Sequence, residues 1–357
     1  MSGCCGRRQC RPWRDWCVDS CADMKWRFAI LAAVGVALAL YLVRYVGWHA
    51  VLAAAAAIGW TGFGLFCCCA LGMFVLLGAA WQVLLPGANA PRLSLLVRAR
   101  LVRDSAAEVL PFSQLGGIAF GVRAAILQGM PAPLAAGSMI ADVTTEMLAQ
   151  IAYTAFGMVI LAARVPEGSH VAALIRGCAI GLALALIAAA LFIALQRRSG
   201  QITARLASRM LRGAGQRLNG LGAALEMIYR SPARVVSSVA LHLAAWIGNA
   251  ATVWLAFRLI GVRIDLTAAI AIESLVYAIR SAAVFIPNAL GVQEGAYLLL
   301  GPLFGVATDA ALAVSVLKRA RDIAIGVPVL LMWQAAEGRR ALSRSAVRPH
   351  PGDGPVQ

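Results

Sequence analysis

The chain has 357 residues, of which 61% are hydrophobic and only 13% carry a charge, and its mean hydropathy is +0.77. This composition excludes an ordinary soluble domain and predicts a polytopic α-helical membrane protein, because apolar runs of about 20 residues, the length that crosses a bilayer, recur along it. The net charge of +16 does not indicate nucleic-acid binding, since the arginines cluster between the apolar runs and at the chain ends. The runs are Phe28–Val46, Gly62–Leu85, Leu134–Ala163, Val171–Leu195, Val235–Ile260 and Ala310–Trp333.

Residues 1–24 are a basic tail in which five of the chain's nine cysteines occur. The tail lacks paired CxxC units and nearby histidines, so its spacing predicts no metal site. Met24 directly precedes the first apolar run and is therefore a second candidate start of translation. That run is longer than the core of a signal peptide, so we expect an uncleaved anchor.

Arginine-rich segments set the expected topology. Cytoplasmic loops of membrane proteins carry an excess of Lys and Arg. The basic segments here are the N-terminal tail, Arg92–Arg103, Arg197–Arg234 and Arg339–Arg348. Placing all four on one face puts both termini in the cytoplasm and makes residues 25–338 a single transmembrane domain, followed by a cytoplasmic tail at 339–357.

Counting crossings between these basic segments predicts two segments that enter and leave the membrane by the same face. The first is Ala106–Gln128, and the second is Leu266–Phe304. Only re-entrant paths through them return each basic segment to the cytoplasm, which gives about six full crossings plus two re-entrant segments. The expected turn residues are Pro111, Gly116, Gly117, Pro287, Gly291 and Gly295.

The two irregular segments are candidates for an internal repeat. An offset of 176 residues aligns Pro111 with Pro287, Gly129 with Gly305 and Glu146 with Asp322. Because the first segment enters from the cytoplasm and the second from outside, the two halves would be inverted. Three matches are few enough to arise by chance, but paired Gly/Pro-interrupted segments in two halves indicate the binding site of a transporter.

Ionisable residues within the apolar segments are expensive in a bilayer and are therefore expected to face the bundle interior. Asp142 and Glu146 lie four residues apart on one helix face. We expect their partners among Arg123, Arg280 and the basic cluster Lys318–Arg321. Two interpretations stay open: ion pairs that fix helix packing, or a polar path for a headgroup or a proton.

Glu294 stands next to glycines at the expected start of a half-helix. The free N–H groups of such a start favour an anionic ligand, which would make Glu294 a neighbour of the binding site. The same position suits an ordinary capping carboxylate. The sequence does not distinguish these two roles.

No catalytic set is present in the sequence. The four histidines are scattered, and HExxH, GxSxG, Walker and GxGxxG patterns are absent. We therefore expect no enzymatic activity, no cofactor and no bound metal.

Three runs carry a resemblance to a known family. They are LPFSQLGGIAFGVRAAILQGMP from residue 110, ADVTTEMLAQ from residue 141 and IPNALGVQEGAYLLLGPLFG from residue 286. They resemble the lysylphosphatidylglycerol synthase transmembrane-region family of flippase-like proteins, over about residues 25–338. The turn Pro287–Gly291 departs from the Pro-Gly-Gly type frequent in that family, which puts the family's backbone geometry at this turn in doubt.

The resemblance implies movement of a lipid between the leaflets of a bacterial inner membrane, or lipid handling in a hopanoid pathway. The implied partners are membrane lipids, either hopanoid or anionic phospholipid, together with enzymes of the hopanoid pathway. Relatives that make aminoacylated lipid carry an additional soluble transferase domain, whereas only a short basic tail follows Trp333 here. Aminoacyl transfer by this chain alone is therefore not expected.

The expected headgroup path combines the buried charges with the second re-entrant segment. Two alternatives remain open: a membrane-embedded enzyme in which Asp142 and Glu146 bind a metal, and a scaffold that recruits enzymes through its basic faces. The expected path residues are Arg123, Asp142, Glu146, Glu273, Arg280, Gln293, Glu294, Arg319, Arg321 and Asp322.

Overall fold

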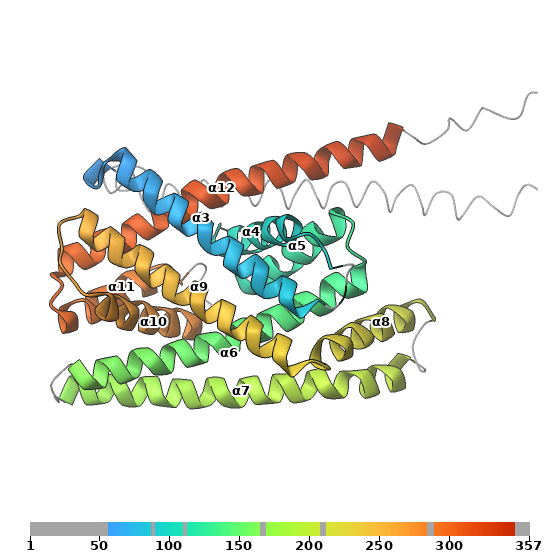
Figure 1. Cartoon of the computed structure of the whole chain (residues 1–357), viewed down its shortest axis with the longest axis horizontal. Coiled ribbons are helices and arrows are strands. Elements are labelled where there is room, and N and C mark those ends of the chain that lie inside the picture. The colour runs from blue at the N-terminus through green and yellow to red at the C-terminus, as the bar shows by residue number, and fades with distance from the viewer. Residues whose placement is uncertain are drawn as a thin grey trace, which may run out of the picture.

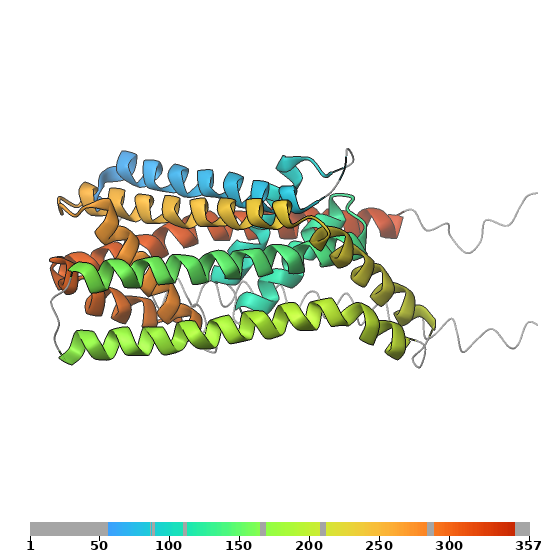
Figure 2. The ribbon, with the colours of Figure 1, turned by 60° about the horizontal axis from the view of Figure 1, so that its bottom comes forward.

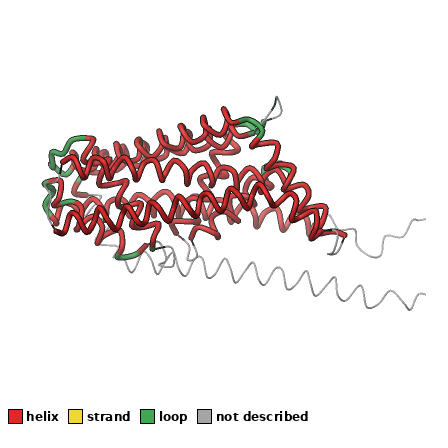
Figure 3. Tube along the Cα trace, turned by 90° about the horizontal axis from the view of Figure 1, so that it is seen from below, coloured by secondary structure: helices red, strands yellow, loops and turns green. Residues whose placement is uncertain are grey.

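Long apolar helices make up most of the computed structural model, which describes residues 56–85, 87, 90–109, 113–164, 169–207, 212–283 and 289–346. Within these ranges every regular element is a helix, as Figure 3 shows, so the expectation of an all-α membrane protein is confirmed. Four of these helices are long and apolar enough to cross a membrane. They are α3 (Gly59–Leu84), α6 (Ala132–Arg164), α7 (Ser169–Ala207) and α9 (Pro232–Leu259).

These four helices coincide with four of the six apolar runs. The run Phe28–Val46 lies outside the described residues. The run Ala310–Trp333 falls within the 39-residue helix α12 (Thr308–Ala346). This helix is long enough to span a membrane but is less apolar than the other four. The number of crossings therefore stays a prediction.

Two helical hairpins lie between the long helices (Figure 1). The first is α4 (Leu93–Val109) with α5 (Ser113–Leu127), and the second is α10 (Leu266–Ala282) with α11 (Val292–Leu300) and the 3₁₀ helix η2 (Pro302–Phe304). At 1.5 Å per residue, the 17 residues of α4 reach only about 25 Å and the 9 of α11 about 13 Å. Neither hairpin therefore has the length of two full crossings, and the re-entrant path expected of each stays a prediction.

The first hairpin begins earlier than predicted. It starts at Leu93 rather than Ala106, so Arg100 and Arg103, expected in a cytoplasmic link, lie inside it and are 0% and 5% exposed. The apolar runs missed α4 because its charges interrupt them, and those charges are neutralised both within α4 and by partners on other helices. The expected turn residues Pro111 and Pro287 lie outside the described residues.

The offset of 176 residues relates whole helices and not only three positions. Adding 176 to the bounds of α3, α4, α5 and α6 gives 235–260, 269–285, 289–303 and 308–340, which overlap α9, α10, α11 with η2, and α12. In Figures 1 and 2, α3 and α9 run in opposite directions, and so do α6 and α12. The structure thus supports an inverted repeat.

Two apolar clusters fill much of the interior, each centred on one repeat and each also taking in side chains of the other. In the first repeat, Trp81, Leu96 and Met139 belong to one buried cluster drawn from α3, α4, α5 and α6. In the second, Phe257 and Tyr297 belong to a larger cluster centred on α9, α10, α11 and α12. The amphipathic helix α8 (Arg212–Tyr229) packs against α6 and α7 at one end of the bundle.

The glycines Gly129 and Gly305, which the offset aligns, have corresponding backbone roles. Each stands just before a long helix and has a positive φ, of 100° and 75° respectively. An L side chain is disfavoured in the left-handed region, so glycine permits the turn from hairpin to long helix.

Gly305→Ala is expected to destabilise the protein by about 1–2 kcal/mol, because it places a β-carbon on a left-handed backbone. Gly177→Ala is the matched control, since Gly177 lies within α7 and an added β-carbon there meets nothing within 4 Å. That control is expected to gain about 0.5–1 kcal/mol. Denaturant unfolding in detergent, followed by tryptophan fluorescence, measures both; equal effects at the two positions would contradict the assignment.

Candidate functional site

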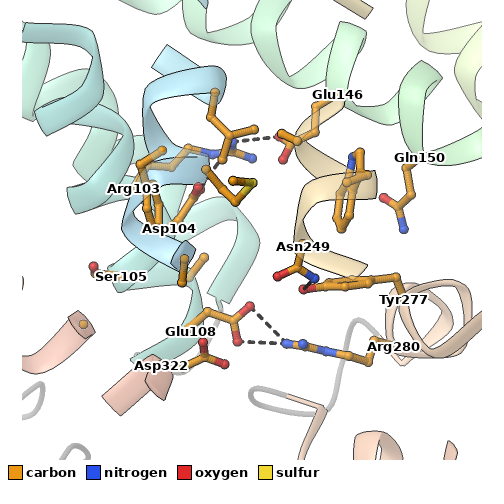
Figure 4. Close-up of a pocket in the computed structure, with 18 of the residues that line it drawn as sticks. Arg103, Asp104, Ser105, Glu108, Glu146, Gln150, Asn249, Tyr277, Arg280 and Asp322 are labelled. Atoms are coloured by element: carbon orange, nitrogen blue, oxygen red, sulfur yellow. Dashed lines mark hydrogen bonds and ion pairs between the residues drawn. The ribbon is translucent and has the colours of Figure 1, made fainter. Parts of the chain in front are cut away.

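A cavity of about 420 Å³ lies between the two repeats, lined by residues of α3, α4, α6, α9, α10 and α12 (Figure 4). Its size falls within the usual range of small-ligand pockets. Apolar side chains of α3 and the rings of Trp246 and Tyr277 form part of the wall. Seven lining residues are ionisable: Arg103, Asp104, Glu108, Glu146, Arg280, Arg321 and Asp322.

One ion pair joins the two re-entrant hairpins at this cavity. Glu108 lies near the end of α4 and Arg280 near the end of α10. The Arg280 Nη2 donates to both carboxylate oxygens of Glu108, at 2.8 and 3.0 Å, as Figure 4 shows. Arg280 also donates to the Gln293 side chain at 2.9 Å and lies over the Tyr277 ring. The last turns of α4 and α10 are therefore joined by charges that face the cavity.

A buried acid cluster lies on the α4 and α6 side of the cavity. We define it as Arg100, Arg103, Asp104, Asp142, Glu146 and His242. Arg100 is fully buried, and its guanidinium donates to Asp104 at 2.9 Å and also to Asp142 and Glu146. Arg103 donates to Glu146 at 2.8 Å.

The partners expected for Asp142 and Glu146 were wrong. Instead of residues from Arg123, Arg280 or the Lys318–Arg321 cluster, both carboxylates bind Arg100 on α4. From the sequence, that arginine was expected in a cytoplasmic link, because the ion pairs that join α4 to α6 cannot be seen in it.

A second buried network belongs to the C-terminal repeat. The Glu273 carboxylate accepts from Lys318 Nζ at 2.6 Å, from the Tyr297 hydroxyl and from Asn249 at 3.2 Å. Lys318 also lies 5.0 Å from the centre of the Tyr277 ring. On the cavity side, the neighbouring residues Arg321 and Asp322 form an ion pair at 2.8 Å.

Glu294 is a capping residue. Its carboxylate accepts the Gly291 N–H at 2.9 Å, and the side chain of Arg319 donates to both of its oxygens. The positive φ of Gly291, 78°, forms the turn that starts α11. Glu294 does not line the cavity, so of its two interpretations the structure favours the cap.

The structure divides the expected path residues into three groups. Those on the cavity wall are Glu146, Arg280, Arg321 and Asp322. Those behind the wall, buried and bonded to charged partners, are Asp142, Glu273 and Gln293. Those away from it are Arg123, which pairs with Glu337, and the pair Glu294 and Arg319.

The expected glycine roles are also divided. An added β-carbon at Gly117 would lie 2.7 Å from the backbone oxygen of Arg103, so this glycine permits the close packing of α4 on α5. At Gly116 and Gly295 it would meet nothing within 4 Å, so close approach explains neither of them.

The sequence reasoning missed Arg103 and Asp104 on the cavity wall and Arg100 behind it, and it placed Glu108 among the interior charges without assigning it to the path. A signal was present, because Arg100 and Asp104 are spaced for an i,i+4 pair on one helix. That pair, followed by Glu108 on the same face, indicated a helix with a charged side where a loop was expected.

The metal-binding alternative has no support in the described geometry. The carboxylates of Asp142 and Glu146 both accept hydrogen bonds from Arg100, whose positive charge occupies the place where a cation would lie. Among the described residues, no three His, Cys, Asp or Glu side chains are grouped as metal ligands.

Comparison with known families identifies the domain. The sequence model described as "Lysylphosphatidylglycerol synthase TM region" matches residues 28–329. The chain belongs to the lysylphosphatidylglycerol synthase transmembrane-region family. It is thus a multi-pass membrane protein of a family linked to lipid-related processes, and the matched region contains the whole cavity. No curated protein and no solved structure matches the chain.

Arg100→Met in this family member is expected to lower the free energy of unfolding by about 3–5 kcal/mol, because it leaves buried carboxylates without their cation. Arg164→Met is the matched control, since Arg164 pairs with Asp265 where the two side chains are 44% and 51% exposed. Loss of an exposed pair costs below about 1 kcal/mol. Unfolding of both variants in detergent measures the difference, and similar losses would show that Arg100 is not the central cation.

Proposed function

We propose that this protein moves lipid headgroups between the two leaflets of a bacterial inner membrane. The observation that carries the proposal is the cavity between two inverted repeats, where two re-entrant hairpins bring charges of both signs into an apolar bundle. Irregular backbone and ionisable residues at membrane depth are characteristic of a substrate path. Broken elements at the meeting of inverted repeats are where secondary transporters bind their substrates.

The chemistry of the cavity suits a polar or charged headgroup. Each lining charge has a protein partner, and Arg280 of the hairpin pair has further contacts to Gln293 and Tyr277. A headgroup that enters would exchange these bonds for its own, so no charge is left unpaired at any stage. Glu108 and Arg280 bond the two hairpins through their side chains alone, and we propose that a shift of one repeat against the other would open the cavity to either face.

For the lipid itself, we propose hopanoid or anionic phospholipid, with enzymes of the hopanoid pathway as partners. The support is the resemblance of the runs around both hairpins to a hopanoid-associated member of the family. We propose further that the chain is not an enzyme and needs no cofactor, so that a gradient or downhill movement drives transport. The scaffold alternative has no observation in its favour and is an outcome of the test below.

Replacing Arg280 by Gln is expected to slow lipid movement about tenfold or more, which corresponds to the loss of a charge-assisted hydrogen bond worth about 1.5–3 kcal/mol. The measurement is a leaflet assay in proteoliposomes that contain purified protein and labelled hopanoid or phospholipid. Arg123→Gln is the matched control, because Arg123 is 43% exposed, pairs with Glu337 and lies off the cavity.

The same assay distinguishes the roles of Glu146 and Glu294, the two carboxylates that the sequence analysis singled out. Glu146→Gln alters the cavity wall and is expected to slow transport, whereas Glu294→Gln weakens the start of α11 and is expected to lower stability more than rate. If wild type moves lipid and neither Arg280→Gln nor Glu146→Gln slows that movement, the cavity is not the path. Absence of movement under every gradient, with the protein folded, would favour the scaffold.

We also propose that both termini are cytoplasmic, so that the end of the bundle holding α8 faces the cytoplasm. A phosphatase active only outside the cytoplasm is expected to be inactive when fused after Arg230, between α8 and α9. It is expected to be active after Arg263, between α9 and α10 at the opposite end. Activity with the reverse pattern would invert the assigned orientation.

A further inference from the structure

His242 of α9 has one ring nitrogen bonded and the other free. The side chain is 0% exposed, and its Nε2 lies 3.1 Å from Asp142 Oδ1. The other oxygen of Asp142 binds Arg100, so this carboxylate is an acceptor and Nε2 must carry a hydrogen. The Nδ1 is buried and has no hydrogen-bond partner among the described residues. Nδ1 is therefore the ring atom at which a further proton can bind or leave.

The charge balance of the buried acid cluster depends on that atom. The cluster contains three carboxylates, Asp104, Asp142 and Glu146, and two guanidiniums, Arg100 and Arg103. With neutral His242 the formal charge is minus one, whereas an imidazolium makes it zero.

Each of the two protonation states has one cost. The neutral ring leaves an uncompensated negative charge in an apolar bundle, which is expensive. The imidazolium leaves a buried N–H of Nδ1 without an acceptor, which costs about 1–3 kcal/mol. Because each state carries a cost, neither is strongly favoured, and the cluster can gain and lose a proton.

Within the part of the chain whose side chains the structure describes, the elements around α9 supply no compensating charge. Helix α3, which packs along α9, carries no Asp, Glu, Lys, Arg or His between Gly59 and Leu84. On α10 and α12, each charge that faces α9 already has a partner of opposite charge. Glu226 of α8 pairs with Arg230, which follows that helix, and both side chains are exposed. The matched pairs are Glu273–Lys318, Arg280–Glu108 and Arg321–Asp322.

We propose that the buried acid cluster is a proton-binding site, with His242 Nδ1 as the atom that takes up the exchangeable proton, and that this proton is coupled to the contents of the cavity. Arg103, Asp104 and Glu146 belong to the cluster and also line the cavity. A charged group entering the cavity therefore changes the field at His242, and by linkage the proton changes the affinity for that group. The proton site stands on the cluster alone; its coupling to lipid movement rests on the proposed function.

The proton site is tested without transport, by nitrogen-15 NMR of histidine-labelled full-length protein in lipid nanodiscs across pH 5 to 9 (roughly the range over which histidine titrates). His242→Gln identifies the resonance among the chain's four histidines. We expect the His242 ring to pass between imidazole and imidazolium. In Asp104→Asn the ratio of imidazolium to imidazole at a fixed pH is expected to fall at least about tenfold, because one neighbouring negative charge is gone.

Glu226→Gln is the matched control, since it removes an exposed carboxylate outside the cluster and is expected to leave the His242 signal unchanged. A His242 ring that never changes its protonation, or that responds equally to Asp104→Asn and Glu226→Gln, would overturn the proton site.

Coupling is read in the leaflet assay, as the ratio of lipid movement with and without an imposed pH gradient. We expect a ratio of at least about threefold for wild type and close to one for His242→Gln, since coupling between two sites typically shifts binding by about 5–150-fold. A ratio that His242→Gln leaves at the wild-type value would overturn the coupling. If wild type moves no lipid at all, the proposed function fails, while the NMR result still decides the proton site.

Discussion

Charges that α4 carries into the membrane must be neutralised where they lie, and the arrangement of the bundle follows from this constraint. An ionised side chain at the centre of a bilayer costs at least about 2.5–3.5 kcal/mol, so α4 is acceptable there only while it packs against its partners. Fully buried Arg100 supplies the main contact, because it binds three carboxylates on α4 and α6 at once. The pair Glu108–Arg280 neutralises a further charge of α4 with a residue of the second hairpin. Charge pairing thus decides which helices are neighbours around the cavity.

The two repeats meet through both apolar packing and polar contacts. Helix α3 lies along α9, and Phe66 and Leu161 of the first repeat belong to the same apolar cluster as Phe257 of the second. The polar contacts at this interface include Glu108, Arg280 and Arg321, which line the cavity. Under the proposed function, these are the bonds that would exchange when the cavity is exposed to one face or the other. The unequal charge of the buried acid cluster adds a proton-dependent element to one side of that interface.

Part of the polar interior could be anticipated from the sequence. The structure brings Glu146, Arg280, Arg321 and Asp322 to one cavity, and each of them is a charge placed in an apolar segment. The re-entrant paths of the two irregular segments stay a prediction. The cost of such charges is independent of the fold. The wrong predictions concerned charged residues whose position depends on which other helix they bind. Arg100 and Arg103 were given to a loop, and Arg123 to the path, because charge and spacing alone do not reveal which helix face is covered.

By itself, the sequence determined the helical class, the position of the four apolar helices that are long enough to span, and the offset of 176 that relates the two hairpins. These are local or periodic properties, since hydropathy and breaker residues act over one helix. Tertiary structure alone decided the ion pairs. Arg100 meets Asp142 across 42 residues, and Arg280 meets Glu108 across 172. Which carboxylate meets which base depends on the rotation and depth at which helices pack, and that is set by the whole bundle and not by any segment of it.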